Sequence, residues 1–157
     1  QTQTSNLTVH QGIKLNVKEV QVLHALEKQL KNPFPILKKD TLAYDDFGFI
    51  AKDNYVNALG LYQQGLTTLP EIVCNLTKLQ VLNLYNNHLS SLPNLIGNLQ
   101  DLQVLNLWKN HLSSLPETIG NLIKLENLSL RNNKFLIFPK IITRLINLRH
   151  LELQGNQ

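Results

Sequence analysis

The sequence repeats itself with a fixed period of 23 residues. The leucines that begin equivalent segments and the prolines of one turn recur at this spacing: Leu79, Leu102, Leu125 and Leu148, and Pro70, Pro93, Pro116 and Pro139. A period between roughly 20 and 50 residues is typical of repeat proteins, in which a unit cannot bury its own apolar face and stacks on its neighbours. The 157-residue chain is therefore expected to form a row of stacked coils.

Each full unit combines a strand, a turn and a helical segment. The complete copies read LQVLNLYNNHLSSLPNLIGNL, LQVLNLWKNHLSSLPETIGNL and LENLSLRNNKFLIFPKIITRL. Side chains alternate along a strand, so Leu82 and Leu84 are predicted to face the interior while Asn83 and Tyr85 face outward. The Leu-Pro pair then turns the chain, because proline has no N–H donor and favours an extended preceding residue. The apolar residues after the proline predict a helical turn on the back of the coil.

One asparagine follows every complete strand. The set is Asn87, Asn110, Asn133 and Asn156. A side-chain amide at this position can pair with turn backbone groups that would otherwise be buried without a partner. We therefore expect an asparagine ladder along the stack.

This pattern resembles the leucine-rich repeats of intracellular and microbial proteins. It is similar to the 23-residue class with Leu-Pro turns found in Ras-binding, Roco-type and many bacterial and archaeal proteins. The resemblance covers residues 56–157, including a degenerate first unit at 56–76 and an incomplete last one. It implies an α/β fold, a leucine-rich-repeat solenoid that forms a right-handed curved superhelix with a parallel sheet on its concave side.

The N-terminal third lacks the repeat and is expected to cap the solenoid. Residues 1–15 are predicted to be a flexible tail, and residues 16–55 a capping helix and hairpin. Asn16 is a good helix cap, and Val20, Leu23 and Leu26, with Val22 and Leu30, make one apolar stripe that ends before Pro33. FGFIA and YVNALGLY flank a polar turn, which predicts a hairpin whose second strand begins the solenoid. An alternative is a separate helix for partner binding or oligomerisation.

The chain ends inside a repeat, at LRHLELQGNQ. Its last strand is expected to present an open edge and an exposed leucine layer. We therefore expect that the sequence is a fragment of a longer protein or that a partner covers this end, and association through this C-terminal edge is a further possibility.

Composition and motifs argue against several function classes. The net charge of +4 is too small and too dispersed to predict nucleic-acid binding, and no apolar run has the length of a membrane span. Cys74 is the only cysteine and cannot form an intrachain disulfide, which favours a reducing, cytoplasmic location or no dependence on redox state. Its apolar surroundings predict that it is buried. No catalytic motif is present, so neither an enzyme nor a cofactor is predicted. His88 and His111 are equivalent in adjacent repeats, but no third metal ligand is in register.

The outward strand positions carry the binding prediction. In chain order they form four rows: Ala58, Val81, Val104, Asn127 and His150; Gly60, Asn83, Asn106, Ser129 and Glu152; Tyr62, Tyr85, Trp108, Arg131 and Gln154; and Gln63, Asn86, Lys109, Asn132 and Gly155. The third row places aromatic residues and an arginine side by side, and these types dominate protein-interface hot spots. Mutual stacking that stiffens the sheet is the structural alternative.

We therefore predict a non-catalytic module that binds a protein or peptide on the concave face. Its centre would be Tyr62, Tyr85, Trp108 and Arg131. The residues expected to set specificity are Asn83, Asn106, Lys109, Asn127, Ser129, His150 and Glu152. Two other hypotheses stay open: a regulatory repeat region of a larger signalling enzyme, such as a Roco-type GTPase or a kinase, and a self-associating structural protein.

Overall fold

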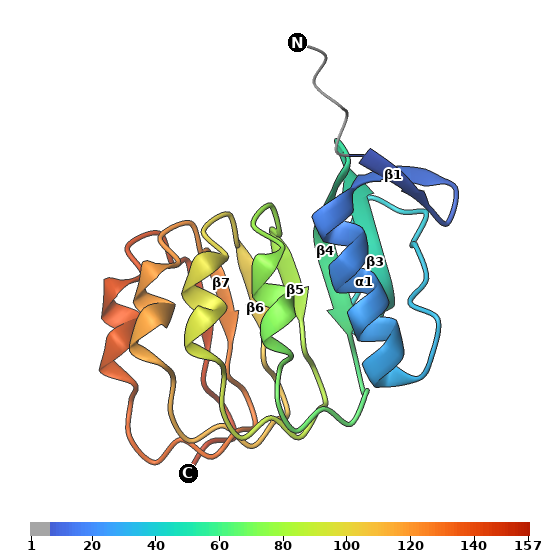
Figure 1. Ribbon diagram of the computed structural model, residues 1–157. Helices are drawn as coiled ribbons and strands as arrows, with labels where there is room; N and C mark the ends of the chain where they lie inside the picture. The colour runs from blue at the N-terminus through green and yellow to red at the C-terminus, as the bar shows by residue number, and fades with distance from the viewer. Residues whose placement is uncertain (1–6) are drawn as a thin grey trace.

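The computed structural model describes residues 7–157, which form a row of stacked coils with a cap at the N-terminal end (Figure 1). One six-stranded sheet runs through the molecule. Its strands, in spatial order, are β3 (Phe47–Lys52), β4 (Tyr55–Leu61), β5 (Val81–Asn83), β6 (Val104–Asn106), β7 (Asn127–Ser129) and β8 (His150–Glu152). β3 and β4 are antiparallel and every later pair is parallel. The predicted solenoid with an N-terminal helix and hairpin is confirmed.

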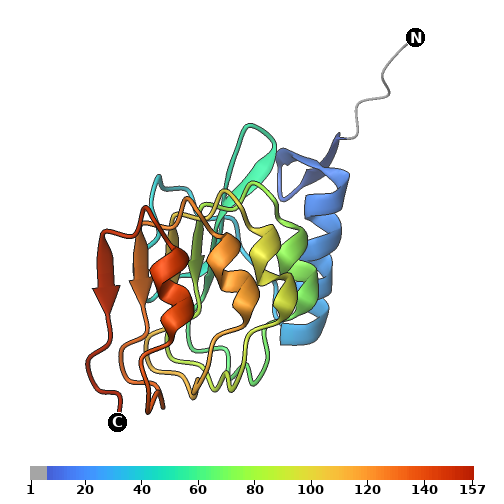
Figure 2. The same cartoon turned by 90° about the vertical axis from the view of Figure 1, so that its left-hand side faces the viewer.

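A short 3-10 helix completes each coil on the side opposite the sheet (Figure 2). These helices are η1 (Glu71–Asn75), η2 (Asn94–Asn98), η3 (Glu117–Asn121) and η4 (Lys140–Arg144). Each one begins directly after the repeated proline, which occupies the N-cap position with the extended ψ typical of a helix boundary. The Leu-Pro pair therefore both turns the chain and sets where the helix starts.

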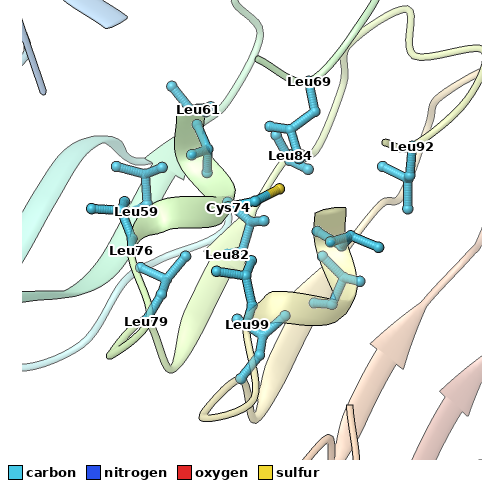
Figure 3. Close-up of a cluster of buried hydrophobic side chains, with 14 of the residues drawn as sticks. Leu59, Leu61, Leu69, Cys74, Leu76, Leu79, Leu82, Leu84, Leu92 and Leu99 are labelled. Carbon is cyan, nitrogen blue, oxygen red and sulfur yellow. The ribbon is translucent and has the colours of Figure 1, made fainter. Parts of the chain in front are cut away.

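Leucines from successive repeats fill the space between the sheet and the helices (Figure 3). Leu82 and Leu84 of one coil and Leu105 and Leu107 of the next are fully buried. Burial of a leucine side chain stabilises a fold by about 1.5–3 kcal/mol. Cys74 lies in the same core, where burial, followed by the charge of Glu71, raises the pKa of its thiol to about 11. This cysteine is a core residue and not a nucleophile.

The asparagines after the strands form a continuous ladder of hydrogen bonds. Asn110 is typical: its Oδ1 accepts from the Leu89 backbone N–H at 3.0 Å, and its Nδ2 donates to the carbonyls of Leu84 and Leu107 at 3.0 and 3.1 Å. Asn87, Asn133 and Asn156 make the corresponding bonds in their own repeats. Each amide thus joins the turn of one coil to the turn of the coil before it.

The capping helix α1 (Val17–Leu30) packs beside η1 and covers the first coil. The Asn16 side chain accepts a hydrogen bond from the Lys18 N–H at its start, and Lys31 ends it in the left-handed conformation two residues before Pro33. Glu19 is buried, and its Oε2 accepts from the Val56 N–H of β4 at 2.9 Å. This carboxylate therefore fastens the helix to β4, the first strand of the repeats.

The prediction of a flexible tail over residues 1–15 is wrong for the part that the structure describes. β1 (Leu7–His10) and β2 (Ile13–Asn16) form an antiparallel hairpin, and Leu15 is fully buried. The turn between them has positive φ at Gln11 and Gly12, a conformation that glycine adopts readily. Strands of four residues are too short to show a clear apolar alternation. Residues 1–6 lie outside the described residues.

Candidate functional site

The parallel register places residues 23 apart directly beside one another. In the first outward row, Ala58 pairs with Val81, Val81 with Val104, Val104 with Asn127 and Asn127 with His150. The second row, from Gly60 to Glu152, follows the same pairing. The concave surface is therefore a grid in which each repeat contributes one residue to each row.

The third row is a continuous stack of side chains across four repeats. The ring centroids of Tyr62 and Tyr85 are 5.2 Å apart, and those of Tyr85 and Trp108 are 4.4 Å apart with nearly parallel planes. The guanidinium carbon of Arg131 lies 5.0 Å from the centroid of the Trp108 ring, within the range of a cation–π contact. We name these four residues the aromatic stack. Because the rings cover one another, all three are half-buried, whereas Arg131 is exposed.

The row after the aromatic stack is constrained by its backbone. Gln63, Asn86, Lys109 and Asn132 all have φ between 52° and 58°, the left-handed region. Asparagine tolerates this conformation better than most residues, and the equivalent residue of the last repeat is Gly155. The predicted specificity residue Lys109 is exposed beside the stack, but the change from asparagine to lysine occurs at a strained position.

A shallow hollow of about 320 Å³ lies over β6, β7 and β8. It brings together five predicted specificity residues: Asn106, Asn127, Ser129, His150 and Glu152. Asn106 also has a structural task, because its Oδ1 accepts from the Trp108 N–H at 3.0 Å and so holds the strand end below the stack. This hollow and the aromatic stack form the open part of the concave face.

The part of the concave face near the cap is covered by residues 36–46 of the connection between α1 and β3, which begins beside β3 with Ile36 paired to Phe49 and then crosses toward β4 and β5. We name this stretch the crossing segment. The Asn83 Nδ2 donates to the Tyr44 carbonyl at 2.8 Å, and the Tyr62 N–H donates to the Asp46 carbonyl at 3.4 Å. The Tyr44 ring meets Tyr85 edge-on, with 5.9 Å between centroids. The sequence gives no sign of this crossing.

Asn83 is therefore not available to a ligand, and its prediction as a specificity residue is wrong. Its side chain is 3% exposed. Its Oδ1 accepts from the Tyr85 N–H at 3.1 Å while its Nδ2 holds the crossing segment. Both ends of the amide thus have structural partners.

The described residues offer no arrangement for metal chemistry. The rings of His88 and His111 are 5.3 Å apart on the surface, and desolvation, Lys134 and His88 together lower the pKa of His111. Among residues 7–157, no three His, Cys, Asp or Glu side chains are grouped so that they could hold a metal ion. Across the same residues, no helix combines the length and apolar character needed to cross a bilayer.

Comparison with known proteins agrees with the geometry. A family model described as a leucine-rich repeat region matches residues 56–156. The chain belongs to the leucine-rich repeat family. A search of curated proteins found no match.

Solved leucine-rich repeat structures are similar to this leucine-rich repeat protein. A leucine-rich repeat protein of Leptospira interrogans is 42% identical, with a TM-score of 0.63 over 64% of this chain and 26% of that one. The plant peptide hormone receptor RGFR1, solved in complex with RGF2, is 37% identical, with a TM-score of 0.53 over 57% of this chain and 15% of that one. The ectodomain of the receptor kinase SOBIR1 from Arabidopsis thaliana shares the fold at 24% identity, with a TM-score of 0.57 over 90% of this chain and 94% of that one.

Proposed function

We propose that this leucine-rich repeat protein binds a protein or peptide on the open part of its concave face, without catalysis. Proteins of this family are generally interaction modules, and the plant receptor RGFR1 was solved in complex with RGF2. The observation that carries the proposal is the aromatic stack. Tyrosine, tryptophan and arginine residues are enriched among interface hot spots, and here they lie in contact on one surface.

The stack can serve a ligand and the fold together. Aromatic pairs contribute about 0.5–1.5 kcal/mol beyond the area they bury, so part of its role is to stiffen neighbouring coils. Preordered rings also lose little side-chain entropy when a ligand arrives. The hollow beside the stack supplies amide, imidazole and carboxylate groups, which suit hydrogen bonds to an extended peptide, whereas the Ser129 hydroxyl is buried.

The test is a selection from a displayed library of linear peptides on the full chain, followed by calorimetric titration of the selected peptide. We expect the double variant Tyr85→Ala/Trp108→Ala to bind at least about tenfold more weakly. Phe138→Ala is the matched control, because Phe138 is an exposed aromatic residue outside the concave rows, and it should leave the affinity unchanged. Circular dichroism verifies that each variant is folded.

A milder variant separates binding from folding if the double variant is unstable. Arg131→Gln removes an exposed charge and leaves the three rings of the stack in place, and we expect an affinity about three- to tenfold lower with an unchanged melting temperature. Unchanged peptide binding in both the folded double variant and Arg131→Gln would contradict the proposal.

A further inference from the structure

A cleft lies between the crossing segment and the concave sheet, next to the ends of the strands that are farthest from the aromatic stack. Its volume is about 940 Å³, within the range of roughly 300–1,000 Å³ typical of ligand sites. Leu37 and Leu42 of the crossing segment form one wall, and Val81 and Val104 belong to the other. Tyr44 and Asn83, which fasten the segment to the sheet, are not part of the lining.

The floor of the cleft is formed by apolar residues of the first outward row, whereas the later residues of this row are polar. Ala58, Val81 and Val104 occupy the first row where it lines the cleft, whereas Asn127 and His150 continue the same row beyond the cleft. Val81 and Val104 are only half-buried, so the crossing segment does not close on them. Apolar surface on both sides of an open cleft favours an aliphatic group between them.

The rim of the cleft is basic. Lys38, Lys39 and Lys52 line it together with one acidic residue, Asp40. Lys39 is paired with Asp46. Within residues 7–157, neither Lys38 nor Lys52 takes part in an ion pair. Two ammonium groups beside an apolar cleft are complementary to a ligand with one anionic end.

We propose that this cleft binds an aliphatic carboxylate, with its hydrocarbon against Val81 and Val104 and its carboxylate near Lys38 and Lys52. A free fatty acid of medium length and the C-terminal residue of a peptide ending in leucine share this chemistry. The cleft and the surface of the proposed function share Val104, which also lines the hollow over β6, β7 and β8, but none of the aromatic stack lines the cleft.

The first test is calorimetric titration of the full chain with octanoate. The variant Val81→Asn/Val104→Asn is expected to bind at least about tenfold more weakly, since it replaces the apolar floor by a polar one. Asparagine is already present at this position of the next repeat, as Asn127, so the strands tolerate it. Ile123→Asn is the matched control, because Ile123 is exposed and does not line the cleft, and it should bind octanoate like the wild type.

The second test addresses the charge and the source of the acid. Lys38→Gln/Lys52→Gln should weaken octanoate binding about three- to tenfold and leave the binding of neutral octanol unchanged. A short peptide ending in leucine is compared with its C-terminal amide: binding of the free acid alone supports a peptide ligand, and binding of octanoate without either peptide supports a fatty acid. Absence of binding by both acids, or octanoate binding that survives the two valine replacements, overturns the proposal.

Discussion

The two parts of the concave face are built from the same repeat but present different surfaces. The crossing segment lies over β4 and β5 and its cleft reaches Val104 at the start of β6, whereas an open hollow lies over the rest of β6 and over β7 and β8. The strand register is the same in both parts. The difference therefore comes from a segment outside the repeats, so a regular scaffold can carry an irregular binding surface.

Gly60 is the residue in which this difference is clearest. Its equivalents in the second row have larger side chains: Asn83, Asn106, Ser129 and Glu152. A Cβ atom on Gly60 would lie 2.6 Å from the Asp46 carbonyl oxygen of the crossing segment. The degenerate sequence of the first repeat is thus partly explained by the close approach of another stretch of backbone.

Gly60→Ala should have the largest effect, because it forces the crossing segment away from the sheet. We expect a loss of about 3 kcal/mol in the free energy of unfolding, measured by urea denaturation, with faster amide exchange over residues 43–46. Ser129→Ala is the control in the same row of the open part. The Ser129 hydroxyl is buried and makes no hydrogen bond to any described residue, so its removal should cost less than about 0.5 kcal/mol. If Gly60→Ala and Ser129→Ala lowered the free energy of unfolding equally, the covered and the open parts of the concave face would not differ in the way described.

A pair of equivalent asparagines sharpens the comparison. Asn83 and Asn106 both accept from the backbone N–H two residues later, but only Asn83 also holds the crossing segment. We expect Asn83→Ala to cost about 2 kcal/mol and Asn106→Ala about 1 kcal/mol in the same denaturation experiment. A larger cost for Asn106→Ala would show that the segment is not fastened by this amide.

Glu19 allows a test of the cap through pH. Burial raises the pKa of its carboxyl group, and the hydrogen bond from the Val56 N–H opposes this in part. The folded state therefore binds the proton more tightly than the unfolded state, and this group makes the wild type less stable as pH rises from about 4.5 through the raised pKa. Glu19→Gln keeps an acceptor for Val56 without the charge, so we expect it to be about 1 kcal/mol more stable at pH 7. Melting temperatures of the wild type and the variant, measured across pH, should show that the loss of stability with rising pH is smaller in the variant. The same pH dependence in both proteins would contradict the prediction.

The smallest effect on stability is expected at an apolar pair on the outer turn of the fourth repeat. Leu136 and Ile137 are 72% and 79% exposed, and the equivalent residues of the preceding repeats are serines or threonines that are also exposed. Leu136→Ser/Ile137→Ser should change the free energy of unfolding by less than about 0.5 kcal/mol. It should reduce the binding of a hydrophobic dye, since it removes most of an apolar patch. A large loss of stability would mean that these side chains pack in solution.

The regular features of the molecule could be predicted because they are local and periodic. The spacing of Leu82 and Leu84, the Leu-Pro turn and the phase of Tyr85 follow from alternation and from the repeat. The crossing segment could not be predicted in this way. It is held by contacts between Tyr44 and residues about 40 positions later, and no pattern near Tyr44 indicates them.

The sequence predicted which residues occupy the candidate site, but it did not predict which of their side chains a ligand can reach. Strand phase placed Tyr85, Trp108 and Arg131 in one row, which the structure also shows. The same reasoning placed Asn83 beside them as a free side chain, although it is covered. Sequence phase indicates which face a residue occupies, but whether another part of the chain lies over that face depends on tertiary contacts.

The aromatic stack also has an optical consequence. Trp108 is the only tryptophan in the chain, and its ring lies 4.4 Å from that of Tyr85 and 5.0 Å from the Arg131 guanidinium. At such separations the absorption of the tyrosine is coupled to the indole, and a cation over the ring affects its emission. Tryptophan fluorescence of the unmodified protein, excited where tyrosine absorbs little, therefore comes from one position on the concave face and can report on a ligand that approaches there.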